Sequence, residues 1–296
     1  MSKTAILFPG QGSQKVGMGA DHASTNEAFK AVIDEADSIL NMKLSAIMFN
    51  GPDEALRQTE NTQPAIFVHS IALYETLNLK PDMVAGHSLG EFSALVACRA
   101  IGFEDALLFV RNRGKLMQHA GEVNPGTMAA VIGMDNETVE RICNEETHDM
   151  NDIVVPANYN SPGQLVISGH EAAIDRAILA LKKNGCKLAK KLPVSGAFHS
   201  PLMQPALDGL REQLENLEVS EPVCPVYSNY TARATTNPEQ IRSNLLSQLL
   251  NPVLWTQTLT NMNADGATSF IEVGPGSVLQ GLVKRTLSSV ETKGYQ

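Results

Sequence analysis

The hydrophobic and polar positions of this chain follow two different periods. Between Phe29 and Leu40, apolar side chains recur at three- and four-residue spacing, which predicts an amphipathic helix. Short apolar runs at residues 4–8 and 83–85 instead predict buried strands. Further helices are predicted at residues 64–77 (with Pro64 in the first turn), 91–99, 104–119, 201–217, 239–250, 255–263 and 278–287, and further strands at 225–228 and 269–273. Strands that alternate with helices in this way predict a mainly parallel sheet covered on both faces.

The segment between residues 126 and 195 has its own order of elements. A strand is predicted at 127–134, a helix at 136–147, strands at 153–158 and 164–168, a helix at 171–184 and a strand at 187–194. This order is typical of a ferredoxin-like α+β domain. We therefore expect a large α/β-hydrolase-like domain made of residues 1–125 and 196–296, interrupted by a small ferredoxin-like domain at residues 126–195.

Composition and charge exclude several classes of function. With 296 residues, of which 43% are hydrophobic, the chain is long enough to bury a large core. Its net charge of -9 argues against general binding to nucleic acid or to a membrane surface. No stretch approaches the about 18 apolar residues of a membrane span, and the first residues lack the pattern of a secretory signal. The four cysteines are scattered without the spacing of a zinc site, which favours reduced thiols and a cytoplasmic protein.

The segment Gly86-His87-Ser88-Leu89-Gly90 carries the most specific chemistry. It lies between a predicted strand and a predicted helix, where two glycines permit a tight turn that lifts a serine hydroxyl clear of the sheet. This arrangement indicates acyl transfer through a covalent serine ester. For the motif alone, an ordinary tight turn that carries a serine is the alternative. The serine needs a base within hydrogen-bond reach, and the adjacent His87 is expected to point away from it.

Eight motifs follow one another between residue 6 and about residue 285. They are Phe8-Pro9-Gly10-Gln11-Gly12-Ser13-Gln14, Thr62-Gln63-Pro64-Ala65, Gly86-His87-Ser88-Leu89-Gly90-Glu91, Arg111-Asn112-Arg113-Gly114, Asn160-Ser161-Pro162-Gly163-Gln164, Gly196-Ala197-Phe198-His199-Ser200, Gln248 with Asn251-Pro252-Val253, and Glu272-Val273-Gly274-Pro275-Gly276. In this order the chain resembles the malonyl-CoA:acyl-carrier-protein transacylases, which include the acyltransferase domains of fatty-acid and polyketide synthases. The resemblance implies transfer of a malonyl group from malonyl-CoA to the phosphopantetheine thiol of an acyl carrier protein, for fatty-acid or trans-acting polyketide synthesis.

The resemblance also implies roles for individual residues. It makes Ser88 the nucleophile and His199 the general base. Gln248 would orient the histidine through a backbone carbonyl, with simple helix capping as the other interpretation of this residue. The backbone N–H groups of Gln11 and Leu89 would stabilise the oxyanion. A phosphate cradle is a poor alternative for the turn around Gln11, because the lysine of such a loop is missing.

Substrate contacts are implied in the same way. Arg113 would bind the malonyl carboxylate through two parallel hydrogen bonds, and the alternative is a surface arginine on its helix. Asn158 and Asn160 would contact the donor or the carrier arm, and the alternative is turn formation at Asn160-Ser161-Pro162-Gly163. For docking of an acidic carrier, the lysine-rich segment at residues 182–191 is one candidate, and its other interpretation is a solvated helix end followed by an edge strand.

The resemblance implies a monomer that needs neither a metal nor another cofactor. Two other classes of function compete with acyl transfer to a carrier. An acyl hydrolase that edits acyl carrier proteins would use the same serine, but Arg113 favours one carboxylate-bearing substrate over varied acyl groups. A non-catalytic module that only binds the carrier would not need Ser88, His199, Gln11 and Arg113 together.

Overall fold

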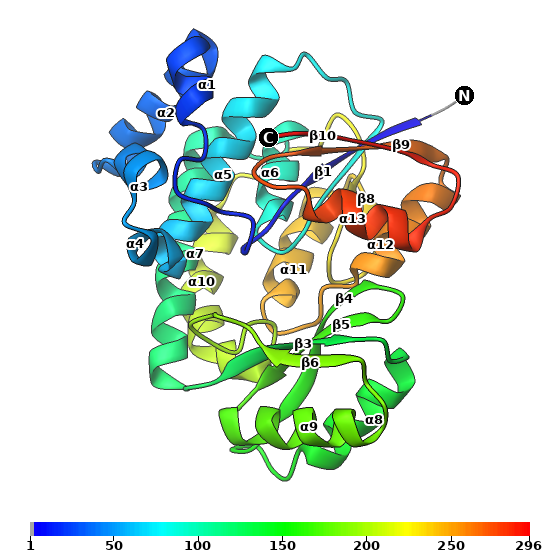
Figure 1. Ribbon diagram of the computed structural model, residues 1–296. Coiled ribbons are helices and arrows are strands. Elements are labelled where there is room, and N and C mark those ends of the chain that lie inside the picture. The colour runs from blue at the N-terminus through cyan, green and yellow to red at the C-terminus, as the bar shows by residue number, and fades with distance from the viewer. Residues whose placement is uncertain (1–2) are drawn as a thin grey trace.

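The computed structural model describes residues 3–296 and is built around a six-stranded sheet (Figure 1). The strand order is β10-β9-β1-β2-β7-β8, and neighbouring strands are parallel except for the antiparallel pair β7–β8. These strands span Lys3–Phe8 (β1), Met83–Gly86 (β2), Val226–Tyr227 (β7), Ala234–Thr235 (β8), Ala267–Val273 (β9) and Glu291–Tyr295 (β10). The predicted, mainly parallel sheet is thus confirmed. Met1 and Ser2, which open the segment inspected for a signal sequence, lie outside the described residues.

Helices cover both faces of this sheet. They span Ala20–Thr25 (α1), Glu27–Leu40 (α2), Leu44–Asn50 (α3), Asp53–Arg57 (α4), Thr59–Thr76 (α5), Gly90–Ala97 (α6), Phe103–Val123 (α7), Asn136–Glu146 (α8), Glu171–Lys183 (α9), Gln204–Asn216 (α10), Pro238–Gln248 (α11), Trp255–Ala264 (α12) and Val278–Thr286 (α13), with a short 3-10 helix at Pro201–Met203 (η1). Successive side chains of a strand point to opposite faces. Ile6 and Phe8 therefore pack in one core with α5, α6, α7 and α10, while Ala5 and Leu7 pack in another with α12 and α13.

A second sheet, of four antiparallel strands, forms the lower part of the molecule in Figure 1. Its strands span Thr127–Ile132 (β3), Val154–Ser161 (β4), Gln164–Gly169 (β5) and Leu188–Lys191 (β6), in the order β4-β5-β3-β6. With α8 and α9 this is the predicted ferredoxin-like arrangement. Ala129 and Val131 pack into a core with these two helices, so that the alternate residues of β3 face the large sheet. The division of the chain into domains at residues 126 and 195 stays a prediction.

The helix that contains Pro64 differs most from the sequence prediction. The prediction that it begins at Pro64 is wrong, because α5 begins at Thr59 and the proline lies inside it. Proline has no N–H to donate to the carbonyl of Glu60, one turn earlier. Arg111 of α7 donates to that carbonyl instead. The lost backbone hydrogen bond is thereby replaced, and α5 is tied to α7.

Several short elements have no counterpart in the sequence prediction. α1, α3 and α4 have only 6, 7 and 5 residues, too few for a helical period to show. β10 has the polar sequence ETKGY and pairs with β9 at the sheet edge, where a strand needs no continuous apolar face. The predicted strand at 225–228 shortens to two residues. No helix within residues 3–296 is long and apolar enough to cross a membrane.

Acid is expected to destabilise the fold in part through His69 of α5. This side chain is 2% exposed, and within the described part of the chain its Nδ1 has no hydrogen-bond partner. Burial, helped by the nearby His22 and Lys15, lowers the pKa of His69 from 6.5 to about 3. Between these two values the unfolded chain binds a proton that the folded chain does not, so the free energy of unfolding falls as the pH falls through 6.5. At pH 5 the loss from this histidine is about 2 kcal/mol.

Urea unfolding at pH 7 and pH 5 measures this loss. His69→Leu should lose about 2 kcal/mol less than the unaltered chain between the two pH values. His119→Gln, on a side chain that is 65% exposed, should lose as much as the unaltered chain. Equal acid sensitivity in His69→Leu and the unaltered chain would contradict the role given to the buried histidine.

Candidate active site

Ser88 lies on a sharp turn between β2 and α6. Its φ of 52° is in the left-handed region, which is strained for a residue with a side chain. The flanking glycines make this turn possible by close approach: a Cβ on Gly86 would lie 1.9 Å from the carbonyl of Gly90, and a Cβ on Gly90 would lie 2.1 Å from the carbonyl oxygen of Phe8. The tight turn predicted at residues 86–90 is therefore formed, and we call it the elbow. At its two glycine positions there is no room for a side chain.

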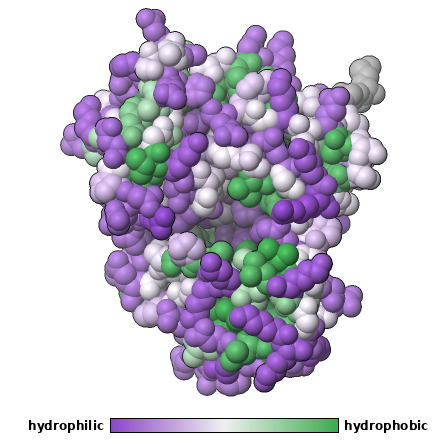
Figure 2. Space-filling model, viewed as in Figure 1, coloured by the Kyte–Doolittle hydropathy of each residue, from purple (hydrophilic) through white to green (hydrophobic). Residues whose placement is uncertain are grey.

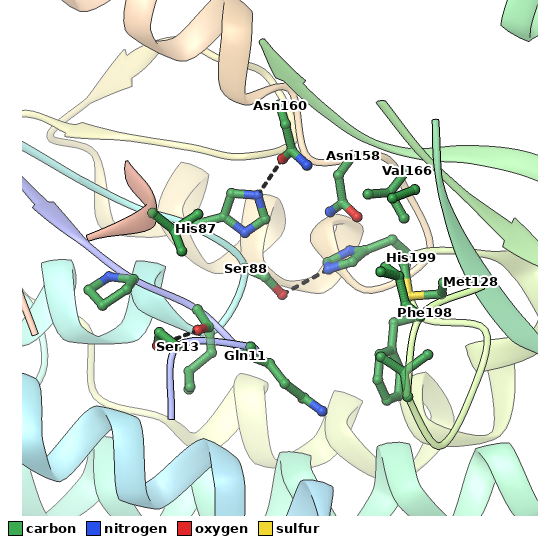
Figure 3. A pocket seen from close by; sticks show the side chains of 18 of the residues that line it. Gln11, Ser13, His87, Ser88, Met128, Asn158, Asn160, Val166, Phe198 and His199 are labelled. Atoms are coloured by element: carbon green, nitrogen blue, oxygen red, sulfur yellow. Dashed lines mark hydrogen bonds between the residues drawn. The ribbon is translucent and has the colours of Figure 1, made fainter. Parts of the chain in front are cut away.

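Ser88 and His199 lie within hydrogen-bond distance of each other. The serine Oγ is 2.8 Å from Nε2 of the histidine (Figure 3). The other ring nitrogen, Nδ1, is 3.0 Å from the backbone oxygen of Gln248, the last residue of α11. Because a carbonyl oxygen can only accept, the ring proton belongs on Nδ1, and Nε2 is left to accept from the serine. Burial and the charge of Arg113 lower the pKa of His199 from 6.5 to about 3, so the ring is neutral near pH 7.

His87 faces away from Ser88, as predicted. Its Nε2 lies 2.9 Å from Oδ1 of Asn160, which stands on β4 across the cleft (Figure 3). The ring also packs at a tilt against Trp255. Burial lowers the pKa of His87, so this histidine too is neutral near pH 7. Its contacts link the elbow to the second sheet.

Arg113 lies buried beside Ser88 and is only 2% exposed, so the alternative of a surface arginine is wrong. Its guanidinium donates to Oε1 of Gln63 at 2.7 Å and to Oε1 of Gln248 at 3.0 Å, and one Nη lies 3.4 Å from the Ser88 Oγ. Burial lowers its pKa to about 10, which still leaves it charged near pH 7. Among the described residues no carboxylate lies within ion-pair distance of it, and its direct hydrogen-bond partners are neutral. The more distant charge of Glu91 opposes the lowering of its pKa.

Gln11 and Leu89 bring two backbone N–H groups to the serine. Leu89 directly precedes the first residue of α6, and Gln11 follows the end of β1. Within the described part of the chain, neither N–H donates to a protein acceptor. The Gln11 turn is held close to the elbow, because a Cβ on Gly10 would lie 2.3 Å from the carbonyl oxygen of His87. Both N–H groups thus have no acceptor within the described residues, and their role as oxyanion donors stays a prediction.

Three polar residues of this site were missed as functional candidates. Gln63, Glu91 and Asn229 are each no more than 2% exposed. Gln63 and Glu91 stand inside two of the eight motifs, and this place in a motif was the available signal. Asn229 offered no such signal. The Gln248 side chain donates to the Ser88 carbonyl and to Glu91, so simple capping of its own helix is not its role.

A cavity of about 310 Å³ lies above Ser88, between the two sheets. Figure 2 shows this region as a hollow between the upper and lower parts of the molecule. Apolar side chains from both parts line it, among them Met117, Met128, Val166, Leu192, Val194, Phe198 and Leu282. Asn158 and Asn160 also line it and lie within β4. The turn expected around Asn160-Ser161-Pro162-Gly163 is formed at Pro162 and Gly163, directly after this strand. Within residues 3–296, no group of three or more His, Cys, Asp or Glu side chains is arranged to hold a metal ion.

The lysine-rich segment at residues 182–191 forms the end of α9 and the edge strand β6. Lys191 pairs with Asp175 at 2.8 Å. The solvated helix end and edge strand are thus present, and docking of a carrier at this segment stays a prediction.

A serine on a glycine-flanked elbow, paired with a histidine at the floor of a cavity, defines a class of enzymes that carry an acyl group on the serine oxygen. A family model described as the acyl transferase domain matches residues 6–295. The chain belongs to this family of acyltransferases, which confirms the resemblance seen in its motifs.

Relatives and solved structures agree with this family. The chain is 44% identical over 295 residues to the malonyl CoA-acyl carrier protein transacylase of Bacillus subtilis, covering 99% of this chain and 93% of that protein. The Escherichia coli protein of the same name is 44% identical over 294 residues, covering 98% and 94%. The crystal structure of an acyl carrier protein S-malonyltransferase from Vibrio cholerae has a TM-score of 0.95 and 42% identity, covering 100% of this chain and 97% of that one. A malonyl-transacylase in complex with its type II polyketide synthase acyl carrier protein has a TM-score of 0.95 and 42% identity, covering 99% and 96%.

Proposed function

We propose that this chain transfers the malonyl group of malonyl-CoA to the phosphopantetheine thiol of an acyl carrier protein, through an ester on Ser88. The observation that carries the proposal is the buried Arg113, a cation without a carboxylate partner, placed 3.4 Å from the hydroxyl of that serine. A malonyl thioester ends in a free carboxylate, which a guanidinium binds with paired charge-assisted hydrogen bonds. The names of the relatives support the same substrates.

In the first half of the exchange, the Ser88 oxygen attacks the thioester carbon while its proton passes to Nε2 of His199. The carbon–sulfur bond then breaks, and the CoA sulfur leaves with the proton from the histidine. In the second half the carrier thiol gives its proton to His199 and attacks the ester, and the serine oxygen regains the proton as it leaves. Each half therefore returns the histidine to its neutral form.

The remaining groups stabilise charge and hold the histidine. The N–H groups of Gln11 and Leu89 would donate to the oxyanion of each tetrahedral intermediate, each worth ~10²–10³ in rate. The backbone oxygen of Gln248 keeps the His199 proton on Nδ1. A neutral carbonyl fixes the ring without adding the charge stabilisation of a carboxylate. The chain and the two substrates supply every group that this sequence of steps needs.

The proposal also covers further substrate contacts, the oligomeric state, the cellular compartment and the pathway. Asn158 and Asn160, on the wall of the cavity, are proposed contacts of the CoA or carrier arm. Ser88, His199 and Arg113 contact one another within one chain, so these contacts need no second copy, and we propose action as a monomer. The four cysteines are unpaired, which supports a reducing compartment such as the cytoplasm. The product would feed fatty-acid or polyketide synthesis.

Arg113→Met should lower malonyl transfer much more than acetyl transfer. The variant removes two charge-assisted hydrogen bonds to the malonyl carboxylate, and acetyl has no group that uses them. We expect kcat/KM for malonyl-CoA to fall about 10²-fold or more, and the rate with acetyl-CoA to change little. Steady-state kinetics with both thioesters measure the ratio. An equal fall for both would contradict the carboxylate contact.

Intact mass spectrometry tests the function as a whole. The protein is mixed with malonyl-CoA, and a phosphopantetheine-bearing carrier protein is then added. One malonyl adduct on Ser88 that moves to the carrier is the expected result. An adduct that decays to free malonate in the presence of the carrier would favour an acyl hydrolase. No adduct under acylating conditions would favour a non-catalytic carrier-binding module.

A further inference from the structure

Two side chains from other parts of the chain hold the backbone of the elbow. Asn229, in the loop after β7, accepts from the Ser88 N–H and donates to the Gly86 carbonyl, both at 2.6 Å. Gln248 of α11 donates from Nε2 to the Ser88 carbonyl at 3.1 Å. Because the backbone of Ser88 is strained, bonds on both sides of it resist relaxation of the turn.

Both of these residues meet at Glu91. One carboxylate oxygen, Oε2, accepts from the backbone N–H of Asn229 at 3.0 Å and from Nε2 of Gln248 at 2.8 Å. Glu91 follows the serine by three residues in the first turn of α6 and is 2% exposed. Among the described residues no Lys or Arg forms an ion pair with it, so N–H donors alone satisfy this oxygen.

The same contacts extend to the reacting pair. Gln248 accepts from Nδ1 of His199 with its backbone oxygen and from Arg113 with its side-chain oxygen. A displaced Gln248 would therefore shift His199 relative to Ser88, whose hydrogen bond spans 2.8 Å. Proton transfer in the attack depends steeply on that distance and direction.

We propose that Glu91 is a positioning residue, which fixes Ser88 relative to His199 by holding Asn229 and Gln248 on one carboxylate oxygen. The inference rests on the proposed function only in taking Ser88 and His199 as the reacting pair. In this proposal the position of Oε2, which accepts the two N–H groups, matters, and the charge of the carboxylate does not. Burial raises the pKa of this carboxyl to about 7, and both its protonated and ionised forms keep an oxygen that can accept the two N–H donors.

Glu91→Gln and Glu91→Asp separate position from charge. Glutamine keeps an acceptor oxygen at the same reach and removes the charge, whereas aspartate keeps the charge and withdraws the oxygens by one methylene. We expect malonyl-CoA to acylate Glu91→Gln at close to the unaltered rate and Glu91→Asp about 10²-fold more slowly, with the loss in kcat and little change in KM. A fluorophosphonate serves as a second probe, because it labels an activated serine whatever acyl group the site prefers.

The melting curve and the final extent of labelling give the fraction of each variant that is folded, and the labelling rates are divided by this fraction.

Asp37→Asn is the control, since Asp37 of α2 is also a buried carboxylate, bonded to Ser45. Its loss should lower stability without changing the labelling rate. Labelling of Glu91→Asp as fast as the unaltered chain would overturn the proposal. Glu91→Gln as slow as Glu91→Asp would also overturn it, since charge would then decide the rate. If the unaltered chain reacts with the fluorophosphonate but not with malonyl-CoA, the proposed function fails while the fluorophosphonate rates still test Glu91.

Discussion

Replacing Ser88 by alanine is expected to abolish the malonyl adduct while the fold stays intact. Ser88 is the serine, within residues 3–296, whose Oγ bonds a histidine ring, and no other described hydroxyl has that means of losing its proton. Without the oxygen no ester forms, and transfer to the carrier should fall about 10⁴-fold or more. Intact mass after exposure to malonyl-CoA measures the adduct, and a melting curve verifies the fold.

Ser93→Ala is the matched control for this variant. Ser93 lies in α6, the helix that follows the turn of Ser88. It is fully buried, and among the described residues its Oγ has no hydrogen-bond partner, so alanine replaces it with little change. This variant should take up one malonyl group at the unaltered rate. A malonyl group found by peptide mapping on Ser88→Ala would show that the nucleophile lies elsewhere.

His199→Ala is expected to slow acylation of Ser88 about 10³-fold. The serine then loses the Nε2 that lies 2.8 Å from its hydroxyl, and an unassisted hydroxyl is a weak nucleophile near pH 7. Because burial and Arg113 keep the pKa of His199 at about 3, the histidine that is lost was neutral and ready to accept a proton. Intact mass spectrometry of samples quenched at successive times gives the rate at which the malonyl adduct forms.

The control for this second variant is His119→Ala, at an exposed side chain on α7, which should be acylated as fast as the unaltered chain. The binding of malonyl-CoA to His199→Ala should be little changed, because Arg113 and its partners remain. If His199→Ala keeps most of its acylation rate, another group serves as the base. His87 would then be the next residue to replace, since it adjoins the serine in the sequence.

Local patterns were enough to predict the larger elements of the fold. The apolar period from Phe29 to Leu40 corresponds to α2, and the order of elements between residues 126 and 195 to the ferredoxin-like sheet. The start of α5 could not be predicted in this way. The carbonyl that Pro64 leaves free is satisfied by Arg111, whose side chain arrives from a helix some fifty residues further on.

In the active site too, local sequence predicts some residues and not others. Ser88 and its two glycines are one local turn, so five consecutive residues predict both the strain and the nucleophile. His199 is 111 residues away from that serine, and no period or spacing in the chain relates the two. It was placed in the site by the resemblance of its motif to a family, and the structure then brought its ring to the serine.

The sequence by itself determined the strand–turn–helix around Ser88, the two kinds of sheet and the family, because each depends on neighbouring residues or on motifs in order. Only the tertiary structure decided that Arg113 is buried beside Ser88, and that Glu91 joins Asn229 and Gln248 behind the elbow. Hydrogen bonds between distant segments depend on how two sheets and their helices pack, and the identity of a residue does not specify its partner across the core.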